Sequence, residues 1–190
     1  MIREPSRQSG FTLLELMITI TIAVIITSAV TAGWQGLIEG TTGQRVRSTL
    51  VQSFADARSQ AVTKNEITTL CPLDSNLVCS SDWDGPISIF TDPNNDRSLT
   101  AKTDLIHTHH PIARGSLTAS NSGPAERRYF QYNPDGSAKG TIGNITWCPD
   151  SEDTARAIQL RMNFGGRITW AIDRNGDGIR EDAQGQGLTC

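Results

Sequence analysis

The clearest pattern along the chain is an apolar run that begins at Phe11 and ends at Gly33. It contains about 23 residues, of which only Glu15 is charged. At 1.5 Å per residue, a helix of this length reaches roughly 35 Å, which is enough to cross a bilayer core of about 30 Å. The polar segment 1–10 before it carries two arginines and one glutamate, and a positive flank favours a cytoplasmic N-terminus. The pattern predicts a transmembrane anchor over residues 11–33.

After the apolar run the chain becomes polar but keeps a helical period. Between residues 34 and 64, apolar residues recur at steps of three and four, and charged residues fill the other face. We predict one long helix from Phe11 to about Thr63, with a lipid-embedded first half and an amphipathic second half. The apolar stripe of the second half fits a sheet surface better than a coiled-coil seam, because a sheet-forming region follows directly.

From Glu66 onward the apolar residues follow the period of strands. Turn sequences rich in Gly, Pro, Asn and Asp separate the candidate segments. These segments are 66–71, 86–91, 105–111, 116–119, 127–132, 141–147, 157–162 and 167–172. One helix followed by many short strands indicates an α+β domain, in which the helix covers one face of antiparallel sheets. We place this globular domain at residues 65–190.

Composition and motifs argue against catalysis. The net charge of −3 provides no general attraction for nucleic acid. The chain has neither a G-x-S-x-G nucleophile motif nor a Gly-rich phosphate loop before a helix. His107, His109 and His110 fall in one predicted strand, where the first two project to one face, but no carboxylate partner is fixed by spacing. We expect no enzyme and no cofactor.

The junction between the leader and the apolar run reads Gly10-Phe11-Thr12-Leu13-Leu14-Glu15. It resembles the prepilin cleavage motif of type IV pilins and type II secretion pseudopilins. The resemblance implies that a prepilin peptidase cuts between Gly10 and Phe11, that Phe11 is then N-methylated, and that Glu15 pairs with the terminal amine of a neighbouring subunit. A carboxylate in lipid needs such a cationic partner. The alternatives are a plain single-pass anchor and a secretory signal peptide cut after residues 30–32, although the apolar run exceeds the 7–15 residues usual for a signal peptide.

Two internal segments resemble the minor pilin and pseudopilin branch known as FimT/FimU and GspH. Residues 83–96 are similar to its strand and following acidic loop, and residues 132–138 to its F-x-x-x-G turn, with Tyr132 in place of the phenylalanine. The resemblance implies a type IV pilin-like α+β fold, in which a long N-terminal helix packs on antiparallel β-sheets.

Four cysteines follow the anchor, on the side of the membrane that is expected to be oxidising. Three connectivities are open to them. We favour Cys71–Cys79, which closes a short loop, and Cys148–Cys190, which ties the last residue to a strand. A zinc site is the alternative, but there is no C-x-x-C pair and the spacings fit no zinc module.

We expect no metal site, and the nearest candidate is a calcium loop at residues 173–182. Its oxygen side chains at alternate positions are Asp173, Asn175 and Asp177, followed by a glycine. The twelfth position holds Gln184 where a bidentate glutamate is needed, and Glu181 and Asp182 offer a carboxylate only in a shorter loop. Residues 92–96 share the alternation without the glycine. Such segments usually form turns through their own backbone, so calcium is a secondary hypothesis.

Nucleic acid is a further secondary hypothesis. Some relatives of the FimT type are DNA receptors for natural transformation, and that resemblance points to a C-terminal G-R-x-R motif. Residues 166–169 come nearest but lack the second arginine. The candidate phosphate contacts are Arg127, Arg128 and Arg167, but acidic residues crowd the same end of the chain, and phosphate binding depends on summed positive charge.

The sequence therefore predicts a non-catalytic minor pilin that primes or assembles a type IV pilus. Its partners would be other pilins, contacted through the N-terminal helix, together with the prepilin peptidase and the inner membrane. The globular domain would face the periplasm. The alternatives are a GspH-type pseudopilin of a type II secretion system, a pilus-displayed DNA receptor, and a secreted enzyme with an ordinary signal peptide.

Overall fold

The computed structural model describes residues 10–110, 114–121, 123–140 and 142–190, without the side chains of residues 29–33 and 35. The predicted leader lies outside the described residues apart from Gly10, as do residues 111 and 141 of two predicted strands. The described chain divides into two compact units, Met1–Ile38 and Glu39–Cys190. Each unit is described by itself.

Helix α1 spans Leu13–Lys64, which confirms the single long helix predicted from the sequence. Thr12 caps its N-terminus, because its Oγ1 accepts a hydrogen bond from the backbone N–H of Glu15 at 3.2 Å. This contact is the first half of a capping box, the T-x-x-E arrangement that satisfies a free N–H of the first turn. At the other end, Lys64 suits the negative end of the helix dipole. Asn65, with a φ of 55°, follows the last helical residue.

The first half of α1 exposes its apolar side chains. Phe11 is 81% exposed and Leu13 is 78% exposed, and the apolar residues as far as Ile26 are exposed as well. Among the residues that the structure describes, none of the helices combines the length and the apolar character that a membrane crossing requires. The anchor proposed for residues 11–33 stays a prediction.

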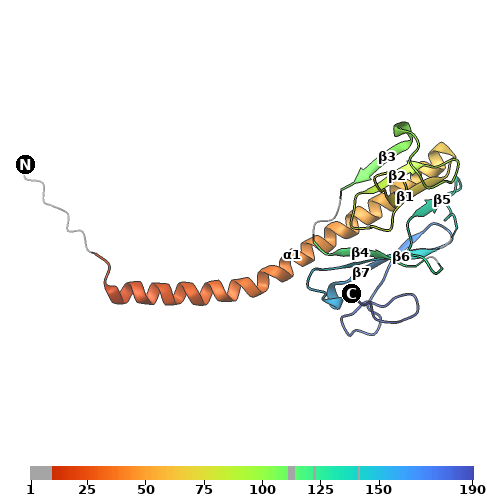
Figure 1. Ribbon diagram of the computed structural model, residues 1–190. Coiled ribbons are helices and arrows are strands. Elements are labelled where there is room, and N and C mark those ends of the chain that lie inside the picture. Colours follow the sequence, from red (N-terminus) through yellow and green to blue (C-terminus); the bar gives the residue numbers. More distant parts are fainter. Residues whose placement is uncertain (1–9, 111–113, 122, 141) are drawn as a thin grey trace, which may run out of the picture. The chain divides into compact units, whose positions relative to one another are not determined.

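Within the described residues, eight strands form two antiparallel sheets, and each strand overlaps a predicted segment (Figure 1). The strands of the first sheet, in the order β3-β2-β1-β5, are Leu105–His109, Ile87–Thr91, Thr68–Pro72 and Phe130–Tyr132. Those of the second, in the order β4-β6-β7-β8, are Ser116–Ala119, Gly143–Cys148, Ile158–Met162 and Ile168–Trp170. Every pair of neighbouring strands is antiparallel.

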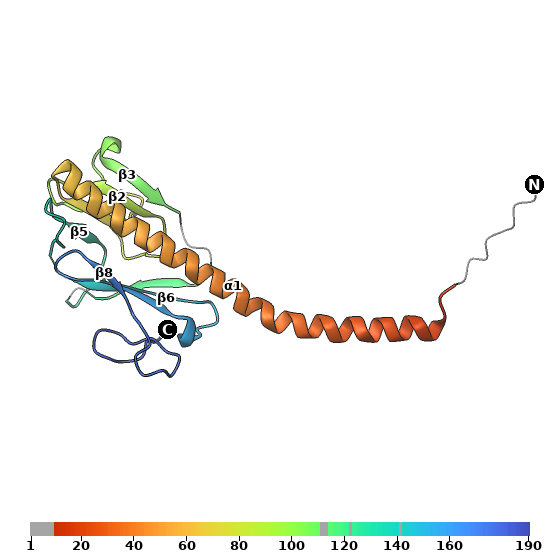
Figure 2. The same cartoon turned by 180° about the vertical axis from the view of Figure 1, so that it is seen from behind.

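The second half of α1 lies across both sheets (Figure 2). Its buried stripe follows helical steps of three and four, and consists of Val46, Leu50, Phe54, Ala57 and Ala61. The same core cluster contains Leu70 and Ile89 of the first sheet and Ile145 and Leu160 of the second. The stripe therefore lies on the sheets, as predicted, and the three layers share one core.

Two disulfides join Cys71 to Cys79 and Cys148 to Cys190, the pairing that we favoured. The first lies in a buried cluster with Phe90. The second ties the end of the chain to β6, across a sequence separation of 42. Leu188, 5% exposed, packs beside it, so the C-terminal segment after β8 is held by a cross-link and a small apolar contact.

Candidate functional site

The N-terminal motif lies at the start of α1. Gly10 precedes the helix, and a methyl group added to it would meet no atom within 4 Å among the described residues. Phe11 and Glu15 are exposed. Glu15 lies in the first turn of α1, and cleavage between Gly10 and Phe11 stays a prediction.

Four hydroxyl groups in the first half of α1 bond back to the helix itself. The acceptors are carbonyl oxygens three or four residues earlier, at 2.6 to 2.9 Å, and the donors are Thr19, Thr21, Thr27 and Ser28. A helix in an apolar surrounding needs its polar groups satisfied in this way, because no water is available to them. Glu15 is left as the one charged side chain of residues 11–28.

Arg127, a predicted DNA contact, is buried in the domain and only 5% exposed. Its guanidinium lies over the ring of Phe130 at 4.9 Å, and its Nη2 donates to the carbonyl of Ile142 at 2.8 Å. It fills the space beside Gly143, where a Cβ would come within 2.5 Å of its Nε. Burial lowers the pKa of the guanidinium. This buried position leaves only a small part of the side chain exposed and gives no support to a DNA contact at Arg127.

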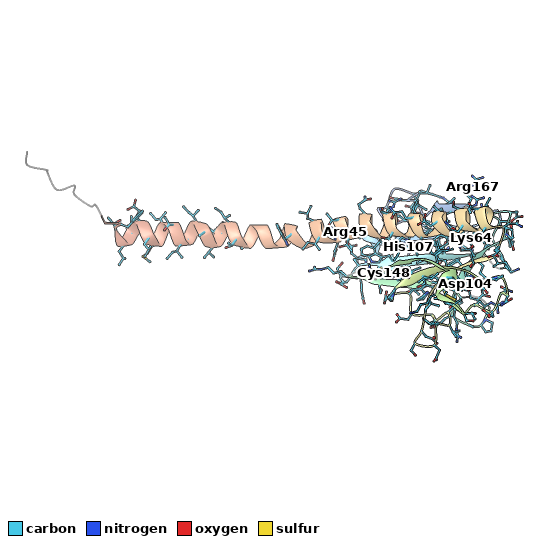
Figure 3. The ribbon with its side chains drawn as sticks, turned by 90° about the horizontal axis from the view of Figure 1, so that it is seen from above. Arg45, Lys64, Asp104, His107, Cys148 and Arg167 are labelled. Atoms are coloured by element: carbon cyan, nitrogen blue, oxygen red, sulfur yellow. A yellow bond between two sulfur atoms is a disulfide. The ribbon has the colours of Figure 1, made fainter. Side chains whose placement is uncertain are left out.

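Arg128 and Arg167 are exposed. Arg128 precedes β5 and Arg167 precedes β8, so the two residues lie next to strands of different sheets. Figure 3 shows Arg167 near Lys64, at the C-terminal end of α1. There it lines a groove of about 520 Å³ with Arg58 and Tyr132. With Arg127 in the core, the three predicted arginines do not form a common surface patch.

Arg58 is a structural residue that the sequence reasoning missed. Its Nε donates to the carbonyl of Gly136 at 2.9 Å, and its Nη2 donates to the carbonyl of Gly165 at 3.1 Å. Tyr132 is buried beneath the same turns, and its hydroxyl donates to the carbonyl of Gly166. Gly166 has a φ of 71°, and an added Cβ would collide with the backbone of Gly136. The F-x-x-x-G-like turn thus joins α1 to both sheets.

Asp92, in the second Asx-rich loop, is a buried structural carboxylate and is 2% exposed. Its oxygens accept hydrogen bonds at 2.8 to 3.1 Å from the side chains of Thr69 and Gln131 and from the backbone N–H groups of Asp96 and Arg97. These bonds make Asp92 the centre of a turn at residues 92–96, and the cluster of three carboxylates found among the described residues lies elsewhere.

His107 and His109 lie side by side on one face of β3, as their spacing predicts, with ring centroids 4.4 Å apart. Partial burial lowers the pKa of His109, the charge of His107 lowers it further, and Asp56 on α1 opposes both effects. The lowered pKa of His109 means that the folded state disfavours its charged imidazole.

The histidine pair should make stability fall in mild acid. The folded-state pKa of His109 lies below 6.5, its ordinary value, so the unfolded chain binds more protons as the pH drops below about 6.5. We expect the unfolding midpoint in urea to fall between pH 7.5 and pH 5, and to fall less in His109→Gln. The exposed His110→Gln is the matched control and should keep the wild-type pH dependence. An equal fall in all three proteins would assign the effect to other groups.

The candidate calcium loop brings together three carboxylates, of which Glu181 was predicted only for a shorter, non-standard loop. One oxygen each from Asp173, Asp177 and Glu181 lies within 4.8 Å of the others. Asn175 is hydrogen-bonded to Asp177 within the same loop. The signal for Glu181 was its ninth position in the loop, and the fold brings it back to the two aspartates.

Two protein-family models match this chain. The model of the family described as "Type II transport protein GspH" matches residues 47–166. The model of the prokaryotic N-terminal methylation motif matches residues 5–31. A search of curated proteins finds no match.

Solved structures of two pilin-like proteins match this chain. A crystal structure of the type IV minor pilin FimU of Pseudomonas aeruginosa strain PAO1 is 19% identical, covers 68% of this chain and 84% of its own, and has a TM-score of 0.49. The minor pseudopilin EpsH from the type 2 secretion system of Vibrio cholerae is 8% identical, with coverage of 67% and 94% and a TM-score of 0.47. Because the GspH model alone matches more than half of the residues, the chain belongs to the GspH family and is a type IV pilin-like minor pilin or pseudopilin with an N-terminal methylation motif.

Proposed function

We propose that this chain is a non-catalytic structural subunit that helps to start or assemble a type IV pilus. One observation carries the proposal: the first half of α1 exposes apolar side chains, satisfies its own hydroxyl groups and has Glu15 as its one charge through residue 28. Such a surface is stable only against lipid or against other apolar helices. A filament of packed N-terminal helices provides the second environment.

In this proposal a prepilin peptidase removes the leader 1–10, and residues 11–33 hold the subunit in the inner membrane until it joins the filament. The domain of residues 65–190 faces the periplasm, where the environment is oxidising and its two disulfides are stable. Residues 34–64 link the two parts, because their apolar stripe is buried in the domain core. Neighbouring pilins are the partners.

The second candidate is a pseudopilin of a type II secretion system. It is favoured by the description of the matching family, "Type II transport protein GspH". Both machines would use the same helix and the same cleavage motif, so the difference lies in the partners. DNA reception has weaker support, because Arg127 is buried and the net charge is negative.

A strain that lacks this chain tests the proposal directly. We expect it to lose surface pili and twitching while exoprotein release stays normal, and a plasmid copy of the wild-type chain should restore both losses. Exoproteins retained in the periplasm with normal pili would instead identify the pseudopilin. An unchanged strain by both measures would contradict an assembly role altogether.

A further inference from the structure

The C-terminal segment after β8, which is blue in Figure 1, contains a cluster of three carboxylates. One oxygen from each of Asp173, Asp177 and Glu181 lies within 4.8 Å of the others. The two ion pairs found among the described residues both join Arg156 to other acidic residues. In that part of the chain, therefore, no lysine, arginine or histidine nitrogen comes within 4.0 Å of the three clustered carboxylates. Three like charges this close repel one another, and a cation between them would turn the repulsion into attraction.

Glu181 supplies an independent observation, because it is a buried carboxylate with an unused oxygen. The residue is only 5% exposed. Its Oε2 accepts a hydrogen bond from the backbone N–H of Arg174 at 2.8 Å. Its Oε1 is shielded from solvent and has no hydrogen-bond donor among the described residues. Buried polar atoms are almost always satisfied, so an unpaired oxygen on a buried carboxylate group that neighbours two further carboxylates indicates a missing positive partner.

The backbone holds Glu181 in this position. It bridges Ile172 on one side and Gly187 on the other, which turns residues 173–180 into a closed loop. Gly176 and Gly178, with φ values of 80° and 90°, allow the loop to turn tightly. The carboxylate at the ninth position is thereby returned to the aspartates at the first and fifth.

We propose that residues 173–181 bind a calcium ion. All the side-chain ligands are oxygens, which suits a hard cation, and Asp173, Asn175 and Asp177 occupy positions one, three and five of the loop. An EF-hand would complete the shell with a glutamate at position twelve, where this chain has Gln184. Here the fold supplies Glu181 from position nine in its place. Calcium fits better than magnesium, because it accepts irregular geometry and more ligands.

Bound calcium would stabilise the part of the domain that has the least regular structure. The loop contains Arg180, whose Nη1 donates to the carbonyls of Ala155 and Ala157, and is followed by the buried Leu188. These contacts fasten the segment to the second sheet. A cation that closes the loop would therefore raise the stability of the whole domain.

The test is thermal unfolding of the full-length chain in detergent, after treatment with EDTA. About 10 mM calcium is ten to a hundred times the dissociation constants typical of extracellular calcium modules. At that excess we expect the unfolding temperature to rise by about 3 to 10 °C, and to rise less in the same concentration of magnesium. Calorimetric titration with calcium alone should give saturable heat.

Glu181→Gln is the diagnostic variant, because an amide oxygen can still accept the hydrogen bond from Arg174. We expect it to lose the calcium-dependent rise while remaining at least as stable as the wild type in EDTA, since one repelling charge is gone. Asp182→Asn is the matched control: it removes a neighbouring charge outside the cluster and can keep the bonds from Gln184 and Gln186. Its calcium response should be unchanged. No calcium effect beyond that of magnesium, or an undiminished response in Glu181→Gln, would overturn the proposal.

Discussion

Replacing Glu15 with glutamine should reduce incorporation of the subunit into filaments by about a hundredfold, while the domain stays folded. In the proposed membrane-bound subunit, the unpaired carboxylate raises the free energy by about 3 kcal/mol on insertion scales. Pairing with the terminal amine of a neighbour would relieve that cost only in the assembled state. Glutamine carries no charge, so it removes both the insertion penalty and the stabilisation gained on pairing. A loss of about 3 kcal/mol lowers the equilibrium constant for incorporation about a hundredfold. Immunoblots of sheared filaments, relative to membrane fractions, measure the ratio.

Glutamine is preferable to alanine here because Glu15 also has a structural position. It is the third residue of α1, and its N–H donates to Thr12. Glutamine suits that capping position as well as glutamate does. Thr12→Ala is the matched control, since it removes the cap at a cost of about 1 kcal/mol and leaves the charge in place. If Thr12→Ala blocks incorporation as strongly as Glu15→Gln, helix capping rather than charge pairing would explain the effect.

The architecture was predictable because each element has its own period. Residues 34–64 repeat apolar positions at helical spacing, and the observed stripe from Val46 to Ala61 is the one that is buried. Each of the eight described strands overlaps a predicted segment, and only β1 and β6 extend past it, by one residue each. Such local signals are strong for long amphipathic helices and for strands between turns. The order of strands within the sheets was not predicted, because it depends on contacts between residues distant in sequence.

The side-chain environments were not predictable, because they depend on tertiary contacts. Arg127 reads as a surface cation, but the absence of a side chain at Gly143 leaves room for its guanidinium against Phe130. Glu181 reads as a carboxylate that only a shorter calcium loop could use, yet it is buried and bridges two neighbouring segments. In both cases the decisive partner lies elsewhere in the chain and leaves no local pattern. Buried charges of this kind are expected to need a specific partner.

Removing the Cys148–Cys190 disulfide should lower the free energy of unfolding by about 4 kcal/mol. The bond joins residues separated by 42 positions, and in the chain-entropy model a loop of that length gives this value. Cys148 is half-buried and Cys190 is exposed, so little packing is lost with the sulfurs. The measurement is the urea midpoint of the full-length chain in detergent, for Cys148→Ser with Cys190→Ser. With about 2 kcal/mol per molar urea, the midpoint should fall by about 2 M.

The other disulfide shows, by comparison, how much stability comes from the cross-link and how much from packing of the sulfurs. Cys71 and Cys79 are only 8 positions apart, so the chain-entropy term falls to about 2.5 kcal/mol, but both sulfurs are buried. Serine there would add the cost of two buried hydroxyl groups, whereas alanine would not. At residues 148 and 190, serine and alanine should be equivalent. A midpoint shift below about 0.5 M for that pair would mean that Leu188 and Arg180 alone hold the C-terminal segment on the second sheet.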